Sequence, residues 1–75
     1  MSHEVFTNTT FTTYTDARNT VTLSGFDFGD DECERIGRIL WDLTTDLADG
    51  EEVECDEVWA EVLTQAGYDP ADFGY

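Results

Sequence analysis

Residues 30–50 read DDECERIGRILWDLTTDLADG, and this stretch decides the fold. Its apolar residues recur at spacings of three and four, which is typical of one face of an amphipathic helix. They are Cys33, Ile36, Leu40, Leu43 and Leu47. Asp30 or Asp31 can act as the N-cap, and Gly50 can end the helix in the left-handed conformation. The pattern predicts a helix at about 31–49.

A second helix is expected after Asp56, which is a suitable N-cap, and Gly67 would close it. Its inner stripe would hold Val58, Val62 and Ala66, widened by Trp59 and Leu63. Between the helices, residues 51–55 fit either a loop or a short third strand with Val53 and Cys55 inward. Asp69 followed by Pro70 predicts one final helical turn, with Phe73 packing back.

The N-terminal part has the composition of β-structure. Residues 4–15 are rich in threonine and aromatic side chains, which favour strands. Residues 16–19 supply turn residues, and residues 20–24 alternate polar and apolar side chains. Phe6 and Phe11 have opposite parity, so the first strand would carry a bulge or expose one ring.

These elements predict a small α+β protein, with residues 1–75 forming a single acidic domain. An N-terminal antiparallel β-hairpin would pack on two amphipathic helices, followed by a short C-terminal helical turn. The hydrophobic fraction of 40% is too high for a disordered acidic tail. Neither a signal peptide nor an apolar run long enough for a membrane span is visible, so the expected location is the cytoplasm.

The chain carries 18 acidic residues and three arginines, has no lysine, and has a formal net charge of -15. Such a surface repels nucleic acid and anionic membranes and attracts proteins with basic, phosphate-binding grooves. The charge is uneven, because residues 1–29 hold three acids whereas residues 30–57 hold twelve.

The candidate partner-binding surface follows from this clustering. At one hundred degrees per residue, five acids fall opposite the apolar stripe of the first helix, and further acids follow it. The surface consists of Asp31, Glu34, Asp42, Asp46, Asp49, Glu51, Glu52, Glu54, Asp56 and Glu57. A row of carboxylates about 5–6 Å apart can approximate a short stretch of DNA phosphates.

Three other residues lie on the first helix near this surface. Arg35 and Arg38 have acids at helical spacing, so we interpret them as helix support through Asp31–Arg35, Glu34–Arg38 and Arg38–Asp42 pairs. Trp41 lies off the apolar stripe. It can either pack against the rest of the fold or serve as an aromatic anchor in the interface.

Catalysis has little support in the sequence. The lone His3 is terminal, no glycine-rich phosphate loop is present, and carboxylate pairs are expected by chance among so many acids. We expect no enzymatic activity, no catalytic residues, no cofactor and no dedicated metal site. An EF-hand register at Gly50 fails, because Leu47 falls where an oxygen ligand is needed. Cys33 and Cys55 are expected to be free thiols in a reducing compartment, with a disulfide as the alternative.

In size, charge and mixed α+β pattern, the chain resembles small acidic phage proteins that mimic DNA, above all anti-CRISPR proteins directed at type I systems, including type I-C. The resemblance implies an inhibitor in the cytoplasm of an infected bacterium, with the type I Cascade complex as its target. The large subunit of that complex reads duplex DNA through basic residues, and occupying its groove would prevent binding of target DNA.

Two other interpretations stay open. Proteins adapted to molar salt are also acidic and poor in lysine, although their acids are spread over the whole surface. An acidic interaction module, such as an antitoxin, would use the same electrostatics toward a basic partner that does not bind nucleic acid. Retention of the fold at about 0.15 M salt would argue against salt adaptation.

Overall fold

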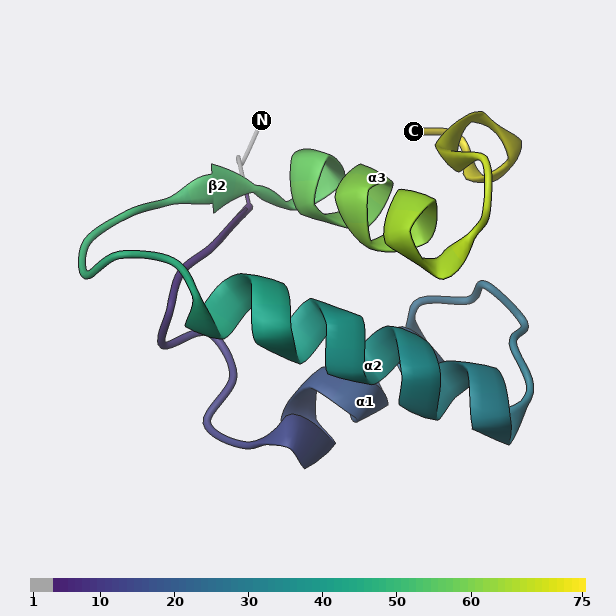
Figure 1. Cartoon of the computed structure of the whole chain (residues 1–75), viewed down its shortest axis with the longest axis horizontal. Helices are drawn as coiled ribbons and strands as arrows, with labels where there is room; N and C mark the ends of the chain where they lie inside the picture. The colour runs from purple at the N-terminus through teal and green to yellow at the C-terminus, as the bar shows by residue number, and fades with distance from the viewer. Residues whose placement is uncertain (1–3) are drawn as a thin grey trace.

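The computed structural model describes residues 4–75 and contains three α-helices, a short antiparallel strand pair and a C-terminal 3₁₀ turn (Figure 1). The elements run in the order β1 (Val5–Phe6), α1 (Tyr14–Leu23), α2 (Asp30–Thr45), β2 (Val53–Glu54), α3 (Cys55–Ala66) and η1 (Pro70–Phe73). The predicted α+β class is confirmed.

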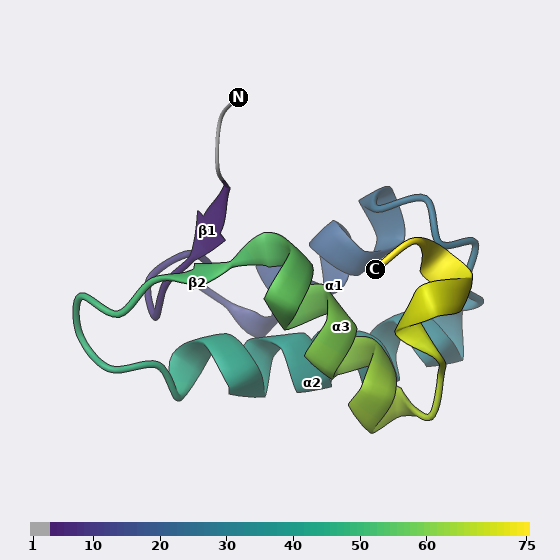
Figure 2. The same cartoon turned by 90° about the horizontal axis from the view of Figure 1, so that it is seen from above.

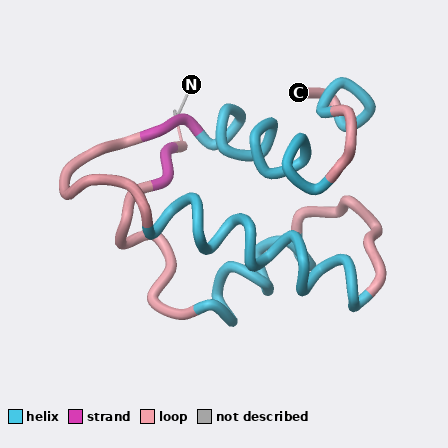
Figure 3. The backbone as a smooth tube through the Cα atoms, viewed as in Figure 1, coloured by secondary structure: helices cyan, strands magenta, loops and turns pink. Residues whose placement is uncertain are grey.

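The strand partners differ from the expected hairpin. β1 pairs with β2, with Val5 opposite Glu54 and Phe6 opposite Val53, so the ladder joins two distant parts of the chain. Within residues 51–55, for which the sequence allowed a loop or a short strand, Val53 and Glu54 form this strand, and Cys55 begins α3. The tube in Figure 3 shows the two strands meeting where α2 connects to α3. The predicted second strand at 20–24 is wrong.

Residues 20–23 instead belong to helix α1, and the cause is a capping box at its N-terminus. The Asp16 amide donates to the Thr13 hydroxyl at 3.3 Å, and the Asp16 carboxylate accepts from the Thr13 amide at 3.2 Å. These bonds satisfy amide groups that the first helical turn leaves without partners. Ala17 and Val21, one turn apart, are fully buried, whereas Leu23 is 84% exposed. A strand would have placed Val21 and Leu23 on the same face.

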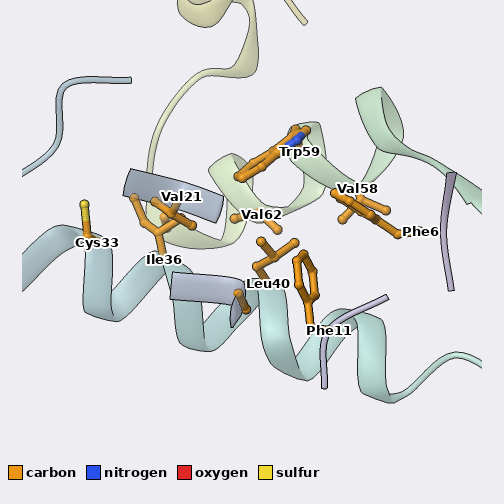
Figure 4. Packing of buried hydrophobic residues seen from close by; sticks show 11 residues of the cluster. Phe6, Phe11, Val21, Cys33, Ile36, Leu40, Val58, Trp59 and Val62 are labelled. Atoms are coloured by element: carbon orange, nitrogen blue, oxygen red, sulfur yellow. The ribbon is translucent and has the colours of Figure 1, made fainter. Parts of the chain in front are cut away.

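The α1–α2 contact depends on a glycine. A β-carbon at Gly37 would lie 2.8 Å from the Cα of Arg18, so the absence of a side chain lets the two backbones approach. α2 runs along most of the long axis of the molecule and contacts α1 and α3 (Figures 1 and 2). The core fills the space between these helices, and Figure 4 shows Leu40 of α2 beside the Phe11 ring and Val62 of α3.

Phe6 and Phe11 are both buried, with ring centroids 5.4 Å apart. Neither a bulge nor an exposed ring is needed, because Phe11 lies beyond β1 after a turn. The Thr7 amide donates to the Thr10 hydroxyl at 2.7 Å, and the Thr10 amide donates to the Thr7 carbonyl at 3.2 Å. This turn reverses the chain and aims Phe11 at the core.

The predicted helices are correct in place and differ at their ends. α2 begins one residue after its N-cap Gly29 and ends at Thr45, five residues before Gly50. The Thr44 and Thr45 hydroxyls donate to the carbonyls of Leu40 and Trp41 at 3.0 and 2.8 Å within the last turn of the helix. The N-cap of α3 is Glu54 rather than Asp56.

The C-terminal end of the fold follows the prediction. Gly67 ends α3 in the left-handed conformation, and the predicted inner stripe of this helix is buried. Asp69 caps the 3₁₀ turn through a 3.0 Å bond from the Ala71 amide. Phe73 packs back edge-on against Phe26, with ring centroids 5.4 Å apart, and also contacts Phe28 and Tyr68.

Candidate acidic interaction surface

All ten carboxylates predicted to bind a partner are exposed. Asp31, Glu34 and Asp42 lie on α2, Asp46 caps its C-terminus, and Asp56 and Glu57 open α3. The loop from α2 to β2 carries Asp49, Glu51 and Glu52, and β2 carries Glu54. These segments meet at one end of the molecule, apart from the first two turns of α2 (Figure 1).

Asp31 and Glu34 stand apart because they share their surroundings with arginine. Both line a depression with Arg35 and Arg38, and Glu34 Oε1 lies 4.0 Å from Arg18 Nε. The three arginines of the chain are Arg18 on α1 and Arg35 and Arg38 within the first nine residues of α2. The positive charge of the arginines therefore offsets the negative charge of Asp31 and Glu34 near the start of α2.

The rest of the predicted surface carries no compensating charge. Residues 39–75 contain 11 acidic residues and no lysine, arginine or histidine. We define the acidic surface as the nine exposed carboxylates of Asp42, Asp46, Asp49, Glu51, Glu52, Glu54, Asp56, Glu57 and Glu61. Its field attracts a cationic partner over a distance comparable to the Debye length, about 8–10 Å at moderate salt.

The loop that carries the middle of the acidic surface is held by its own carboxylates. Asn8 Nδ2 donates to Asp49 Oδ1 at 2.6 Å, which fastens the loop to the turn after β1. The Ala48 amide donates to Glu51 Oε1 at 3.0 Å, and the Glu51 amide donates to the Ala48 carbonyl at 3.0 Å. A partner would meet an ordered loop, which lowers the entropic cost of binding.

Sequence reasoning missed two acids at this end of the fold. Glu61 lies one turn after Glu57 on α3, so helical spacing alone could have found it. The position of Glu4 could not be found from the sequence, because the pairing of β1 with β2 brings this residue to the acidic end of the fold. The Cys55 amide donates to the Glu4 carbonyl at 3.1 Å, which places Glu4 beside the start of α3.

Cys55 and Cys33 are both free thiols, as expected. Partial burial raises the pKa of the Cys55 thiol, and the neighbouring carboxylates of Glu4 and Asp56 raise this pKa further. A thiol with a raised pKa is less often present as the nucleophilic thiolate, so these surroundings lower the reactivity of Cys55.

The arginines of α2 do not form the predicted ion pairs. Arg35 instead binds Glu32 through two bonds of 3.1 and 2.7 Å and donates to the Ala66 carbonyl at 2.9 Å. Tyr68 donates to Glu32 at 2.5 Å. Arg35 and Tyr68 hold the pKa of Glu32 below its ordinary value, and the bond to Glu32 raises the pKa of Tyr68. This network fastens the end of α3 to the start of α2.

Arg38 lies over the Tyr14 ring, with its guanidinium carbon 5.4 Å from the ring centroid. This cation–π contact joins α1 and α2. Trp41 is half-buried and packs against the apolar core. It holds a structural position, and whether its exposed edge also contacts a partner stays a prediction.

Within residues 4–75, no group of three or more cysteine, histidine or acidic side chains is arranged to hold a metal ion. In the same part of the chain, no helix is both long and apolar enough to cross a membrane. In comparisons with known proteins, the chain matches no family model, no curated protein and no solved structure.

Proposed function

We propose that the protein is an acidic decoy that binds the basic DNA-binding groove of a nucleic-acid-binding protein and excludes DNA from it. One observation carries this proposal: nine exposed carboxylates gather over the end of α2, the loop that follows it, β2 and α3, and residues 39–75 contain no basic residue. Self-repulsion among these charges destabilises the folded chain, so their concentration calls for a role in binding.

The charge density supports mimicry of duplex DNA. The molecule is 32 Å long, and DNA of that length carries about 19 phosphate charges. The chain carries 18 acidic side chains and has a formal net charge of -15, with nine of the carboxylates on the acidic surface. Asp42 and Asp46 are four residues apart, as are Glu57 and Glu61, which sets Cβ atoms at about 5–6 Å within each helical pair.

For the target, we propose the type I Cascade complex, with type I-C as the first subtype to test. Support comes from the resemblance in size, charge and α+β pattern to anti-CRISPR proteins. Arginine and lysine side chains that contact DNA phosphates also form charge-assisted hydrogen bonds with carboxylates. A decoy in the groove of the large subunit would prevent DNA binding before any base pairing starts. Opposite charges would make association fast and sensitive to salt.

The uneven surface argues against salt adaptation as the explanation. Exposed positions from residue 9 to residue 22 are dominated by threonine, at Thr9, Thr10, Thr12, Thr13, Thr15 and Thr22, with Asp16 as the acid. A salt-adapted surface would carry acids there too. An interaction module with a basic partner that binds no nucleic acid would use the same acidic surface, and it is separated from the decoy by whether DNA competes.

The proposal is tested by a gel shift with purified type I-C Cascade and a labelled target duplex at about 0.15 M salt. Wild-type protein should remove the shifted band and co-elute with the complex. The variant D42N/D46N/E57Q removes three charges from the acidic surface, at side chains that form no hydrogen bond in the described structure. At least 10-fold more of this variant than of wild-type protein should be needed to remove the shifted band. Asp49 and Glu51 are spared because they hold the loop.

A matched control, D27N/D30N/D72N, removes three exposed charges from the opposite end of the molecule. Asn also tolerates the left-handed conformation of Asp27, whose φ is 63°. This variant should inhibit within about 3-fold of wild type, the change that loss of net charge alone would cause. An unchanged DNA shift with wild-type protein would contradict the Cascade target, and equal losses in both variants would contradict the placement of the surface.

A further inference from the structure

Inside the acidic surface lies a small apolar pocket. It opens between the C-terminal end of α2 and the start of α3, has a volume of about 120 Å³, and is lined by Leu43, Leu47, Val53 and Val58. Glu57 and Glu61 form its remaining wall. Duplex DNA has no apolar pocket of this kind on the surface that a DNA-binding protein contacts, so mimicry of DNA charge does not account for the pocket.

The size and lining of the pocket suit one aliphatic side chain. A cavity of about 150 Å³ lined by apolar groups accepts a molecule of the size of benzene. Leu43 and Val53 pack against the core, so this part of the wall is supported, whereas half-buried Leu47 lies past the end of α2 and outside the core cluster. Leu47 is therefore the apolar lining residue that can be substituted without changing a side chain of the core.

The charges around the pocket define its occupant. Glu57 and Glu61 line it, Asp42 and Asp46 each precede one of its leucines, and no basic residue follows position 38. A second copy of this chain would bring another net charge of -15 against the first, which opposes self-association. A cationic segment is instead attracted to the rim.

We infer that the pocket binds an aliphatic side chain, such as leucine, from a lysine- and arginine-rich segment of the partner protein. The inference rests on the proposed function only in taking the partner to be basic. The apolar contact would lie at the centre of the interface and the ion pairs around it, the arrangement in which buried anchors carry most of the affinity. The carboxylates would attract many basic segments, and the pocket would select among them.

Two labelled nine-residue peptides of lysine and arginine test this inference, one with a central leucine and the other with a central serine. At about 0.15 M salt the leucine peptide should bind wild-type protein about 10-fold more tightly by fluorescence polarisation, since one aliphatic side chain is buried. It should also shift the methyl NMR signals of Leu43, Leu47, Val53 and Val58, which needs no variant.

The variant Leu47→Ser should abolish the preference for leucine while keeping the salt dependence of binding. The matched control is Leu23→Ser, which alters an 84% exposed leucine outside the pocket and should keep the preference. Equal binding of both peptides to wild-type protein, no binding of either, or a preference that survives Leu47→Ser would overturn the inference. The Cascade gel shift is independent of these peptides, so the two proposals fail separately.

Discussion

Gly37→Ala tests the close approach of α1 and α2 that orients the acidic face of α2 outward. The new β-carbon would lie 2.8 Å from Cα, 3.1 Å from Cβ and 3.3 Å from the backbone nitrogen of Arg18. Carbon atoms pack at about 3.5–4.0 Å, so α1 would have to retreat by about 0.7–1.2 Å. The clash is with backbone, and no side-chain rotation can relieve it.

The magnitude is a difference between two opposing effects. Overpacking of this kind costs about 1–3 kcal/mol, whereas replacing a helical glycine by alanine contributes about 1 kcal/mol of helix propensity. We expect Gly37→Ala to lower the free energy of unfolding by about 1 kcal/mol, measured by urea denaturation with tryptophan fluorescence. The control Asn19→Ala, at an exposed position in α1, should instead raise it by a few tenths. A Gly37→Ala protein more stable than wild type would refute the close approach.

Three further outcomes are expected. Glu32→Gln should lower the thermal midpoint at neutral pH, because the ionised Glu32 carboxylate stabilises the folded state. This stability is present above the pKa of Glu32 in the unfolded chain and is lost as pH falls through its lowered pKa in the folded chain, so the difference from wild type should vanish in acid. A difference that does not vary with pH in thermal scans would contradict this. Leu40→Ala should cost about 2–5 kcal/mol in urea denaturation, since Leu40 is fully buried in the core, and a cost below 1 kcal/mol would contradict that packing. Far-UV circular dichroism of wild-type protein should be the same at about 0.15 M and at molar salt, whereas helix loss at the lower concentration would favour salt adaptation.

The sequence predicted the helices well where side-chain period and caps agreed. Cys33, Ile36 and Leu40 recur at helical spacing and are buried, and Gly67 ends α3 as expected. The strand predicted at residues 20–24 was wrong because it relied in part on the general preference of threonine for strands. In helix α1 the Thr20 and Thr22 hydroxyls instead donate to the carbonyls four residues before them, at 3.0 and 3.2 Å. The Thr13–Asp16 capping box was visible in the sequence and outweighs that propensity.

Helical geometry predicted that the carboxylates of the candidate surface are exposed. It did not predict that the surface divides, with Asp31 and Glu34 beside arginines of both α1 and α2 and apart from the other carboxylates. The contribution of Arg18 depends on α1 being a helix packed beside Gly37, a tertiary contact that no local pattern encodes. The apolar pocket likewise depends on how far Leu47 lies from Val58 in space, which is set by the loop that Asp49 and Glu51 hold.

The central claim is tested most directly by the salt dependence of Cascade binding between about 50 and 200 mM salt, with wild-type protein and D42N/D46N/E57Q compared. Wild-type affinity should fall steeply over this range, as it does for proteins that contact DNA phosphates, and the triple variant should show a clearly shallower slope because three charges are missing. Identical slopes for the two proteins, or a flat response of wild-type protein, would contradict recognition through the acidic surface.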